Sequence, residues 1–470
     1  MYFQILSHAG MQVRAAGKTL IFDPWLIGST YWRSWWNYPP PAKDLVDSLR
    51  PDFVYLTHIH WDHFQGPSLK KFPLETPILV PRGNAHRMRK DLNDLGFKNV
   101  REVRHGETVE LAPGFTLTSY QFYPFTDSAA VVEADGVTLL NSNDAKFMGG
   151  PLDQILRRHP KVDFVFRSHS SANPRLCFDF TDAPGESPDD GTRYAADFAD
   201  FAVRTGARYA VPFASNHCFL HRETFALNGT VTTPERVEQV FRERGLRSPE
   251  LKVMVSGDSW DSEAGFSIAD APWFRDRERL LAAYRDEKTP VLEKFYALEA
   301  RTAVPEALVR KYFAAFNAAI PLAARWLFRG RPVTYVLEGA RPQAFRIDLW
   351  KKTANEVDPA GVSDATDPLQ IRTSSLIFRQ CMALNLFLHL GIGKRVRFRS
   401  RRSDAKYHWL LEFLFNLYES EMLPWWRMLS PRFVATWIPR WREIALYGKI
   451  AVKKALGKPF AMSDYLKAGG

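Results

Sequence analysis

Three histidines and an aspartate occupy six consecutive positions just after a strand-like segment. The stretch "DFVYLTHIHWDHFQG" places His58, His60, Asp62 and His63 behind a β-branched and aromatic run. Imidazole nitrogens and carboxylate oxygens are ligands of divalent transition metals. Because residues two apart in an extended segment point to one side, His58 and His60 can hold one metal while Asp62 and His63 reach a second. Packing alone does not explain this density, so we predict a metal centre at the end of the strand.

The first part of the chain, residues 1–265, reads as short strands separated by Gly, Pro and Asp turns, with helical stretches between them. The runs "AAVVEA" and "VTLLN" flank an Asp-Gly dipeptide, the strongest short-range signal for a β-hairpin. Strands interleaved with helices predict an α/β layered domain. Three further regions are expected: a helical connector over 271–330, a small α+β domain over 331–420 and a basic, Trp-rich tail over 421–470.

Composition predicts a globular cytoplasmic protein. Of 470 residues, 46% are hydrophobic and 24% are charged, which is typical of a folded chain. The three cysteines, Cys177, Cys218 and Cys381, form no Cys-x-x-Cys pair and indicate a reducing compartment. The N-terminal "MYFQILSHAG" reads as a strand rather than a secretory signal. The longest apolar stretch, "LIFRQCMALNLFLHLGIG", is interrupted by polar residues and is not expected to cross a bilayer.

The positive charge is concentrated at the C-terminal end. The net charge is +11, and residues 391–470 alone hold 16 Lys+Arg against 6 Asp+Glu. The tail also carries four tryptophans among these cations: Trp425, Trp426, Trp437 and Trp441. Such a segment is typical of a peripheral contact with an anionic membrane at its inner face. Packing of the tryptophans onto the protein body is the alternative, and nucleic acid is disfavoured because no recognisable module accompanies the charge.

The spacing His-x-His-x-Asp-His after a strand resembles the metal signature of the metallo-β-lactamase fold superfamily. That resemblance implies an αββα sandwich, with two sheets face to face and helices outside, and a dinuclear metal site along one edge. It also implies a further aspartate that bridges both metals. Asp144, in "VTLLNSNDAKF", lies where that residue belongs, although an aspartate beside an asparagine is also common in turns.

Longer stretches resemble the catalytic part of the CMP-N-acetylneuraminate hydroxylases. These stretches are "KTLIFDPWLIGSTYWRSWW", "PDFVYLTHIHWDHFQGPSLKKF", "DSAAVVEADGVTLLNSNDAK" and "ARYAVPFASNHCFLH". The similarity is specific in the first 145 residues and looser to about residue 420. It implies an iron-dependent monooxygenase that acts on a nucleotide sugar.

The chain departs from that family in two respects. The vertebrate hydroxylases carry a Rieske iron–sulfur domain with a Cys-x-His and a Cys-x-x-His pair, and this sequence lacks that combination because it contains no Cys-x-His pair. An oxygenase would therefore need a separate electron-transfer partner. Where the family has a metal-binding histidine before a proline, this chain has Tyr123 before Pro124. A phenol with a pKa near 10 is a poor zinc ligand, so Tyr123 is either an iron ligand or a sign of a weakened first site.

The last metal ligand stays open among three histidines. His221 matches the family's histidine eight residues after "PF", whereas His217 lies close by and His169, in "FRSHSSANP", ends another expected strand. Each could equally be a hydrogen-bonded loop histidine. A dinuclear site needs one more donor on its second metal, so we expect at least one of them to contribute.

Residues 331–418 are similar in pattern to sterol-carrier-like domains: a strand pair, a strand entering an apolar helix, a basic strand and an amphipathic helix. That similarity implies an apolar tunnel able to hold an acyl chain. A plain structural cap fits the pattern equally well.

Three functions remain open from the sequence. The first is an iron-dependent hydroxylase with a separate electron donor. The second is a dinuclear hydrolase in which a metal-bound hydroxide attacks an ester, amide or phosphodiester, with Asp62 as base or ligand. The third is a non-catalytic lipid-binding protein with a decayed site. Two divalent metals are expected for the enzymes, iron first and zinc or manganese as alternatives, and the substrate is a nucleotide sugar or a lipid-like molecule.

Overall fold

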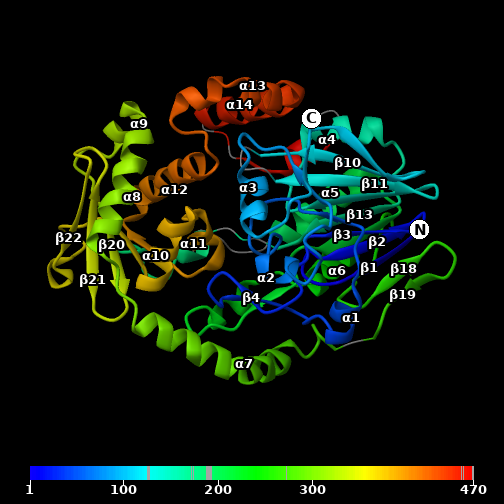
Figure 1. Ribbon diagram of the computed structural model, residues 1–470, viewed down its shortest axis with the longest axis horizontal. Helices are drawn as coiled ribbons and strands as arrows, with labels where there is room; N and C mark the ends of the chain where they lie inside the picture. The colour runs from blue at the N-terminus through cyan, green and yellow to red at the C-terminus, as the bar shows by residue number, and fades with distance from the viewer. Residues whose placement is uncertain are drawn as a thin grey trace.

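Two mixed β-sheets face each other in the N-terminal part of the chain (Figure 1). This computed structural model describes residues 1–123, 127–170, 172, 174–186, 193–270, 272–456, 458 and 460–467. The first sheet has the order β19 (Gly265–Ser267), β18 (Ser259–Asp261), β1 (Tyr2–Ile5), β2 (Met11–Ala15), β3 (Lys18–Phe22), β6 (Phe53–Tyr55), β7 (Ile78–Pro81) and β8 (Val100–Val103). The second has the order β17 (Glu250–Leu251), β15 (Tyr209–Phe213), β13 (Phe164–Ser168), β12 (Val137–Asn143), β11 (Ser128–Ala134), β10 (Phe115–Gln121) and β9 (Glu107–Ala112).

The strand sequences explain why the sheets pack face to face. In β2, Met11, Val13 and Ala15 are buried while Gln12 and Arg14 are more exposed, the alternation expected of a strand with one covered face. Such side chains from both sheets meet in one apolar core between the layers. Burial of this shared core therefore fixes which side of each sheet faces inward.

Helices cover the outer face of each sheet. The first sheet is covered by α1 (Lys43–Ser48), α2 (Gly66–Leu69) and α3 (Arg87–Asp94). The second is covered by α4 (Gly149–Arg158), α5 (Arg193–Thr205) and α6 (Pro234–Glu243). The predicted αββα sandwich, with two sheets face to face and helices outside, is confirmed.

The predicted Asp-Gly hairpin is present. β11 and β12 pair antiparallel, with Ala134 opposite Val137. Asp135 and Gly136 between them have φ values of 52° and 74°, as a two-residue turn with left-handed conformation at both positions requires. This hairpin sets the position of the chain that follows β12, where Asp144 lies.

The C-terminal part forms a third sheet covered by helices. Its order is β14 (Phe178–Phe180), β24 (Arg397–Ser400), β23 (Leu369–Ser374), β20 (Val333–Glu338), β21 (Gln343–Asp348) and β22 (Thr353–Val357). The helices of this part are α7 (Arg277–Ala300), α8 (Glu306–Ala319), α9 (Leu322–Leu327), α10 (Ser375–Leu384), α11 (Leu388–Gly393) and α12 (Ala405–Glu419). In Figure 1, α7 runs along the lower edge, from beneath the sandwich towards this sheet. The helical and α+β region is therefore present, while its likeness to sterol-carrier domains stays a prediction.

Two features cross the predicted domain boundaries. β14, from within residues 1–265, pairs with β24 in the third sheet. The aromatic core of the C-terminal part also includes Trp25, Tyr31, Trp32 and Trp35 of the sandwich. The proposed domain limits stay a prediction, but the two parts share one core at this place.

The tail returns to the sandwich. It consists of the 3-10 helix η5 (Trp425–Leu429), α13 (Pro431–Trp437), α14 (Trp441–Ala455) and α15 (Ser463–Leu466). Leu446 of α14 and Tyr465 of α15 join the core outside the second sheet. Cys177, Cys218 and Cys381 are buried and free. Over the described residues, no helix has the length and apolar character needed to cross a bilayer.

Candidate metal centre

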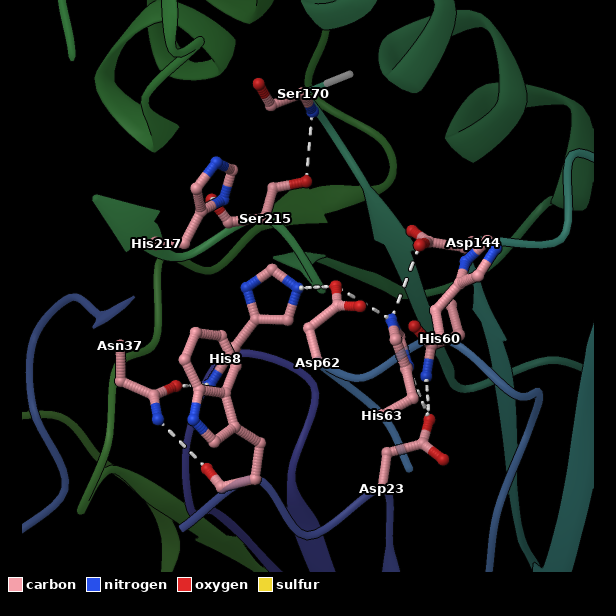
Figure 2. Close-up of polar contacts among 12 residues, drawn as sticks. His8, Asp23, Asn37, His60, Asp62, His63, Asp144, Ser170, Ser215 and His217 are labelled. Carbon is pink, nitrogen blue, oxygen red and sulfur yellow. Dashed lines mark hydrogen bonds and ion pairs between the residues drawn. The ribbon is translucent and has the colours of Figure 1, made fainter. Parts of the chain in front are cut away.

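The side chains of the predicted metal motif lie where strands of both sheets end. β3 and β6 run parallel and end just before Asp23 and the loop that carries His58. β12 and β13 of the facing sheet also run parallel, and they end just before Asp144 and His169. Because the carboxyl ends of parallel strands lie at one edge of a sheet, these segments meet (Figure 2).

His58, His60 and Asp127 form one donor set. His58 Nε2 lies 2.8 Å from His60 Nδ1, and one ligand atom from each of the three residues falls within 4.8 Å of the others. Thr57 Oγ1 lies 2.9 Å from His58 Nδ1, so the opposite nitrogen of this ring faces the set. Two imidazoles and a carboxylate suit iron, zinc or manganese.

His8, Asp62 and His63 form a second, fully buried set (Figure 2). His8 comes from the loop after β1. Its Nε2 lies 3.1 Å from Asp62 Oδ2, and His63 Nε2 lies 3.4 Å from the same oxygen. The Tyr31 hydroxyl also donates to Asp62 Oδ1 over 2.5 Å, which fixes the direction of this carboxylate.

Asp144 lies between the two sets. Its Oδ2 is 3.3 Å from His63 Nε2 and 3.9 Å from His58 Nε2. The rings of His58 and His63 are 4.0 Å apart. This position agrees with the bridging role predicted for Asp144, since metals in dinuclear sites lie about 3.5–4 Å apart.

Asp23 contacts the outer nitrogen of His63 and the main chain and side chain of Thr57. It accepts hydrogen bonds from the Thr57 amide and hydroxyl, both at 2.7 Å, and from Asn143 Nδ2 at 2.6 Å. Its Oδ2 also lies 2.9 Å from His63 Nδ1. A carboxylate on the outer nitrogen of an imidazole fixes the tautomer and leaves the other nitrogen free for a metal. The chain therefore orients His63 before any metal binds.

The charge of the centre is unbalanced towards the negative. Burial alone would lower the pKa of His63, but the surrounding carboxylates of Asp62, Asp23 and Asp144 raise it well above its usual value. Burial would likewise raise the pKa of Asp62, yet His63 and His8 hold it well below its ordinary range. Burial and Asp144 raise the pKa of Asp127 to about 7. The cluster therefore favours a positive charge at its middle.

The geometry of the buried ring nitrogens fits a cation better than hydrogen bonds. His63 Nε2 and His8 Nε2 have no hydrogen-bond partner, although carboxylate oxygens lie 3.1–3.4 Å away, and His8 Nδ1 is also buried without a partner. Buried polar atoms left without partners are costly. Donors that converge at these distances without bonding one another are arranged as metal ligands, so the residues present fit the implied metal pair.

His169 and His217 lie on the His8 side of the centre. The rings of His217 and His8 are 5.5 Å apart, and His217 stacks on Trp35 at 3.7 Å. Both nitrogens of His169 are buried without a partner, and burial, with His8 nearby, lowers its pKa to about 3. A neutral imidazole is the form that binds metal. The structure thus brings both residues near the second set, and their coordination stays a prediction.

His221 lies in a different cluster. Its Nε2 is 3.4 Å from Glu299 Oε2, and its potential ligand group consists of Glu223 and Glu299 rather than the residues of the motif loop. Arg395 donates to both of these carboxylates. The spacing after "PF" therefore does not bring His221 to the candidate centre in this structure.

In the sequence, Tyr123 shortly precedes Asp127 of the first donor set. Its amide donates to Glu443 and its carbonyl accepts from Arg440, so its main chain is held by the tail. The residue is 43% exposed, and a phenol with an ordinary pKa near 10 is protonated at neutral pH. Pro124 lies outside the described residues. The carboxylate of Asp127 lies in the first donor set, where Tyr123 was predicted as a possible ligand. A ligand role of Tyr123 stays a prediction.

Sequence reasoning missed three residues of the centre: His8, Asp23 and Asp127. Each is the single residue of a metal-ligand type near a strand end, in "ILSHAG", "IFDPW" and "FTDSAA". The signal that was available is position rather than spacing, because each one flanks a strand that begins or ends at the edge where the motif loop lies.

The C-terminal part contributes a histidine next to the centre. The ring of His389, from α11, lies 5.6 Å from His60 and 5.0 Å from Trp61. It is buried, and neither of its nitrogens has a hydrogen-bond partner. A cleft of about 680 Å³ lies between the motif loop with α2 and α3 on one side and the end of α10 on the other. Clefts of this volume hold drug-sized ligands.

Sequence comparison finds hydroxylases. A stretch of 146 residues, 30% of this chain, is 32% identical to the cytidine monophosphate-N-acetylneuraminic acid hydroxylase of Mus musculus and covers 25% of it. The enzyme of Pan troglodytes is 34% identical over the same length, with the same shares of the two chains. The chain thus spans about a quarter of the length of the curated relatives it matches. No family model matches the chain.

Structure comparison finds enzymes of both reaction types. The isothiocyanate hydrolase from Delia radicum gut bacteria aligns with a TM-score of 0.42 at 16% identity, over 56% of this chain and 99% of that one. A mutant of CmlA beta-hydroxylase aligns with a TM-score of 0.39 at 17% identity, over 54% of this chain and 52% of that one.

Proposed function

We propose that this chain is a metal-dependent enzyme that holds two metal ions and hydroxylates a small molecule with electrons from a separate donor protein. The observation that carries the proposal is the pair of His/Asp donor sets on either side of Asp144. Hydroxylation is preferred to hydrolysis because of the similarity in sequence to the sialic acid hydroxylases.

Each donor set is assigned to one metal. His58, His60 and Asp127 would hold the first, and Asp62, His63 and His8 the second. Asp144 lies within reach of both. Iron bound there would supply one-electron and dioxygen chemistry.

The chain's own residues orient these donors and keep water away from those of the second set. Asp23 and Thr57 each contact the outer nitrogen of a motif histidine. Tyr31 fixes Asp62. All the donors of the second set are buried, so their charges act in a medium of low polarity, where electrostatic interactions are strong.

The substrate is assigned to the cleft beside the motif loop. Ile59, Trp61 and Phe64 line its sandwich side, and Leu384 and Leu386 line the other. Arg87, which is ion-paired with Asp91, and Lys90 also line it, together with Asp94 and Glu421. Apolar walls with a few charged groups suit a small molecule with one polar end. A nucleotide sugar, as in the names of the relatives, or a lipid-like molecule meets this description.

Metal content and the visible spectrum test the proposal. The full chain is purified with neither added metal nor chelator. We expect about two irons per chain and dioxygen uptake with an artificial electron donor. Two zinc ions and a featureless spectrum would contradict hydroxylation and favour hydrolysis of an ester, amide or phosphodiester. Absence of bound metal would contradict both reactions.

Two variants then separate the two candidates for the third donor of the first metal. If an absorption band of the iron protein disappears in Tyr123→Phe, the phenolate is a ligand. If the band persists in Tyr123→Phe and the metal is lost in Asp127→Ala, the carboxylate is the donor.

A further inference from the structure

Helix α14 presents an apolar face to solvent. Trp441, Ile444 and Val452 are 57%, 51% and 60% exposed, and their spacing places them on one side of the helix. On the opposite side, Leu446 and Ile450 pack against the core outside the second sheet. The helix is therefore apolar on both sides, and only one of them is covered by the rest of the chain.

The preceding segments extend this face. η5 and α13 lead into α14, and α13 and α14 lie along the upper edge of the molecule in Figure 1. We use the name tail surface for the large apolar side chains exposed on these segments and just beyond them: Trp425, Trp426, Leu429, Val434, Ile438, Trp441, Ile444, Val452 and Leu456. Isolated exposed apolar residues are ordinary, but a run of this kind on one segment marks an interaction surface.

Cations accompany the tail surface. Residues 421–470 hold nine Lys+Arg and three Asp+Glu. One of the acids, Glu443, is buried and bound to Arg440. Arg427, Lys449 and Lys454 are exposed, and no ion pair involves them within the part of the chain that the structure describes. The surface therefore combines exposed apolar area with free positive charge.

We propose that the tail surface binds the surface of an anionic lipid membrane, with α14 lying in the plane of the interface. Helices that bind in this way carry Trp and aliphatic side chains on one face and Lys or Arg beside it. Tryptophan prefers the boundary between headgroups and acyl chains. Each cation near an anionic leaflet strengthens binding about fivefold. The proposal does not depend on the reaction at the metal centre.

Vesicle sedimentation with the full chain tests the proposal. Vesicles of phosphatidylcholine are compared with vesicles of equimolar phosphatidylcholine and phosphatidylglycerol. We expect binding to the anionic vesicles only, weakened by added salt. The triple variant Trp441→Ser, Ile444→Ser, Val452→Ser should bind them more than tenfold less tightly. Because these side chains are exposed, the variant should keep its fold, which circular dichroism checks.

A matched control carries the same type of change elsewhere. Val203→Ser with Ile268→Ser removes exposed apolar side chains outside the tail, and vesicle binding should be unchanged. Equal sedimentation with both kinds of vesicle, or undiminished binding by the triple variant, would contradict the proposal. A lipid-free dimer that the triple variant converts to monomer would assign the surface to a second copy of the chain. Tight binding to RNA without binding to vesicles would assign it to nucleic acid.

Discussion

Two buried clusters in this molecule place a histidine and carboxylates within ligand distance, and they differ in how the negative charge is balanced. At the motif loop, the ion-pair partners of Asp62 and Asp144 within the described chain are histidines. Around His221, Arg395 is fully buried and donates to Glu299 at 2.6 Å and to Glu223 at 3.0 Å. The number of donors alone would assign a metal to both clusters. The presence of Arg395 as a cation in the second cluster leaves only the first as a metal site.

The second cluster ties parts of the chain together. Arg395 also donates to the Trp32 carbonyl of the sandwich at 2.8 Å, while Glu299 belongs to α7. Burial would raise the pKa of Glu299, but His221 and Arg395 outweigh it and lower that pKa. This carboxylate is therefore ionised and neutralised without a metal, and the cluster joins the sandwich, α7 and the C-terminal part.

Metal content should give the largest contrast between the clusters. His63 and His221 are both fully buried histidines, so His63→Ala and His221→Ala form a matched pair. We expect His63→Ala to lose at least one of about two metals per chain and all activity, because His63 belongs to the second set and also approaches Asp144. His221→Ala should keep both metals. Elemental analysis checks this, and metal loss in His221→Ala would return that residue to the centre.

Removal of Arg395 should give the largest loss of stability. Arg395→Met leaves the buried carboxylate of Glu299 without its cation, which costs about 3–5 kcal/mol. Arg401→Met, at an exposed arginine nearby in the sequence, should change the free energy of unfolding by less than about 0.5 kcal/mol. Chemical denaturation measures both. Equal effects of the two substitutions would mean that the second cluster is not held by its charge balance.

The sandwich and the motif loop were predictable because their signals are local. Alternating burial in strands such as β2, the Asp-Gly turn and four ligand-type residues in six positions can each be recognised within a few residues. His8 and Asp127 carry no such local pattern. His8 joins the centre because β1 lies two strands from β3 in the first sheet, and Asp127 joins it because β11 pairs with β12 in the second. Both follow from strand order.

His221 shows the opposite limit. It lies at the distance from "PF" at which the family has its ligand, but β16 (His217–Phe219) pairs with β5 (Trp35–Asn37) in a small sheet, and His221 follows it towards α7. Its partner Glu299 is 78 residues further along the chain. Spacing along a loop does not encode the direction in which the loop leaves its strand, so this position could not be decided from sequence.

Asp23 should tune metal affinity without being a ligand. Asp23→Asn weakens the acceptor on His63 Nδ1 and the bonds to Thr57 and Asn143. Loss of such an outer partner lowers metal affinity about 10- to 100-fold. Asp52→Asn changes a carboxylate on the surface at Lys18 and should leave affinity unchanged. Competition with a chelator of known affinity measures this, and equal affinities in the two variants would remove Asp23 from the centre.

Within the part of the chain that the structure describes, the carboxyl of Glu412 is buried without a metal site or an arginine partner, and it keeps its proton instead. Burial raises its pKa to about 8. Its pKa in the folded chain exceeds the ordinary value of about 4.3. The corresponding stability is therefore complete below pH ~4.3 and is lost as the pH rises through about 8. Glu412→Gln should leave stability little changed at pH ~5 and raise it by roughly 1–3 kcal/mol at pH ~9.

Denaturation of wild type and Glu412→Gln across this pH range measures the difference. Glu299→Gln is the informative comparison, because Glu299 is ionised and paired with Arg395. That variant should be destabilised at pH ~5 and pH ~9 alike. A parallel pH dependence of wild type and Glu412→Gln would contradict a protonated Glu412.

His389 tests whether a buried histidine next to the centre belongs to it. Its ring approaches His60, yet it is part of neither donor set. We therefore expect His389→Ala to keep its metals and to lower kcat/KM about tenfold, because its ring packs against Trp61, which lines the cleft assigned to the substrate. His408→Ala removes a buried histidine in α12 and should affect neither quantity. Metal loss in His389→Ala would make it a ligand, and the C-terminal part would then complete the centre instead of closing the cleft over it.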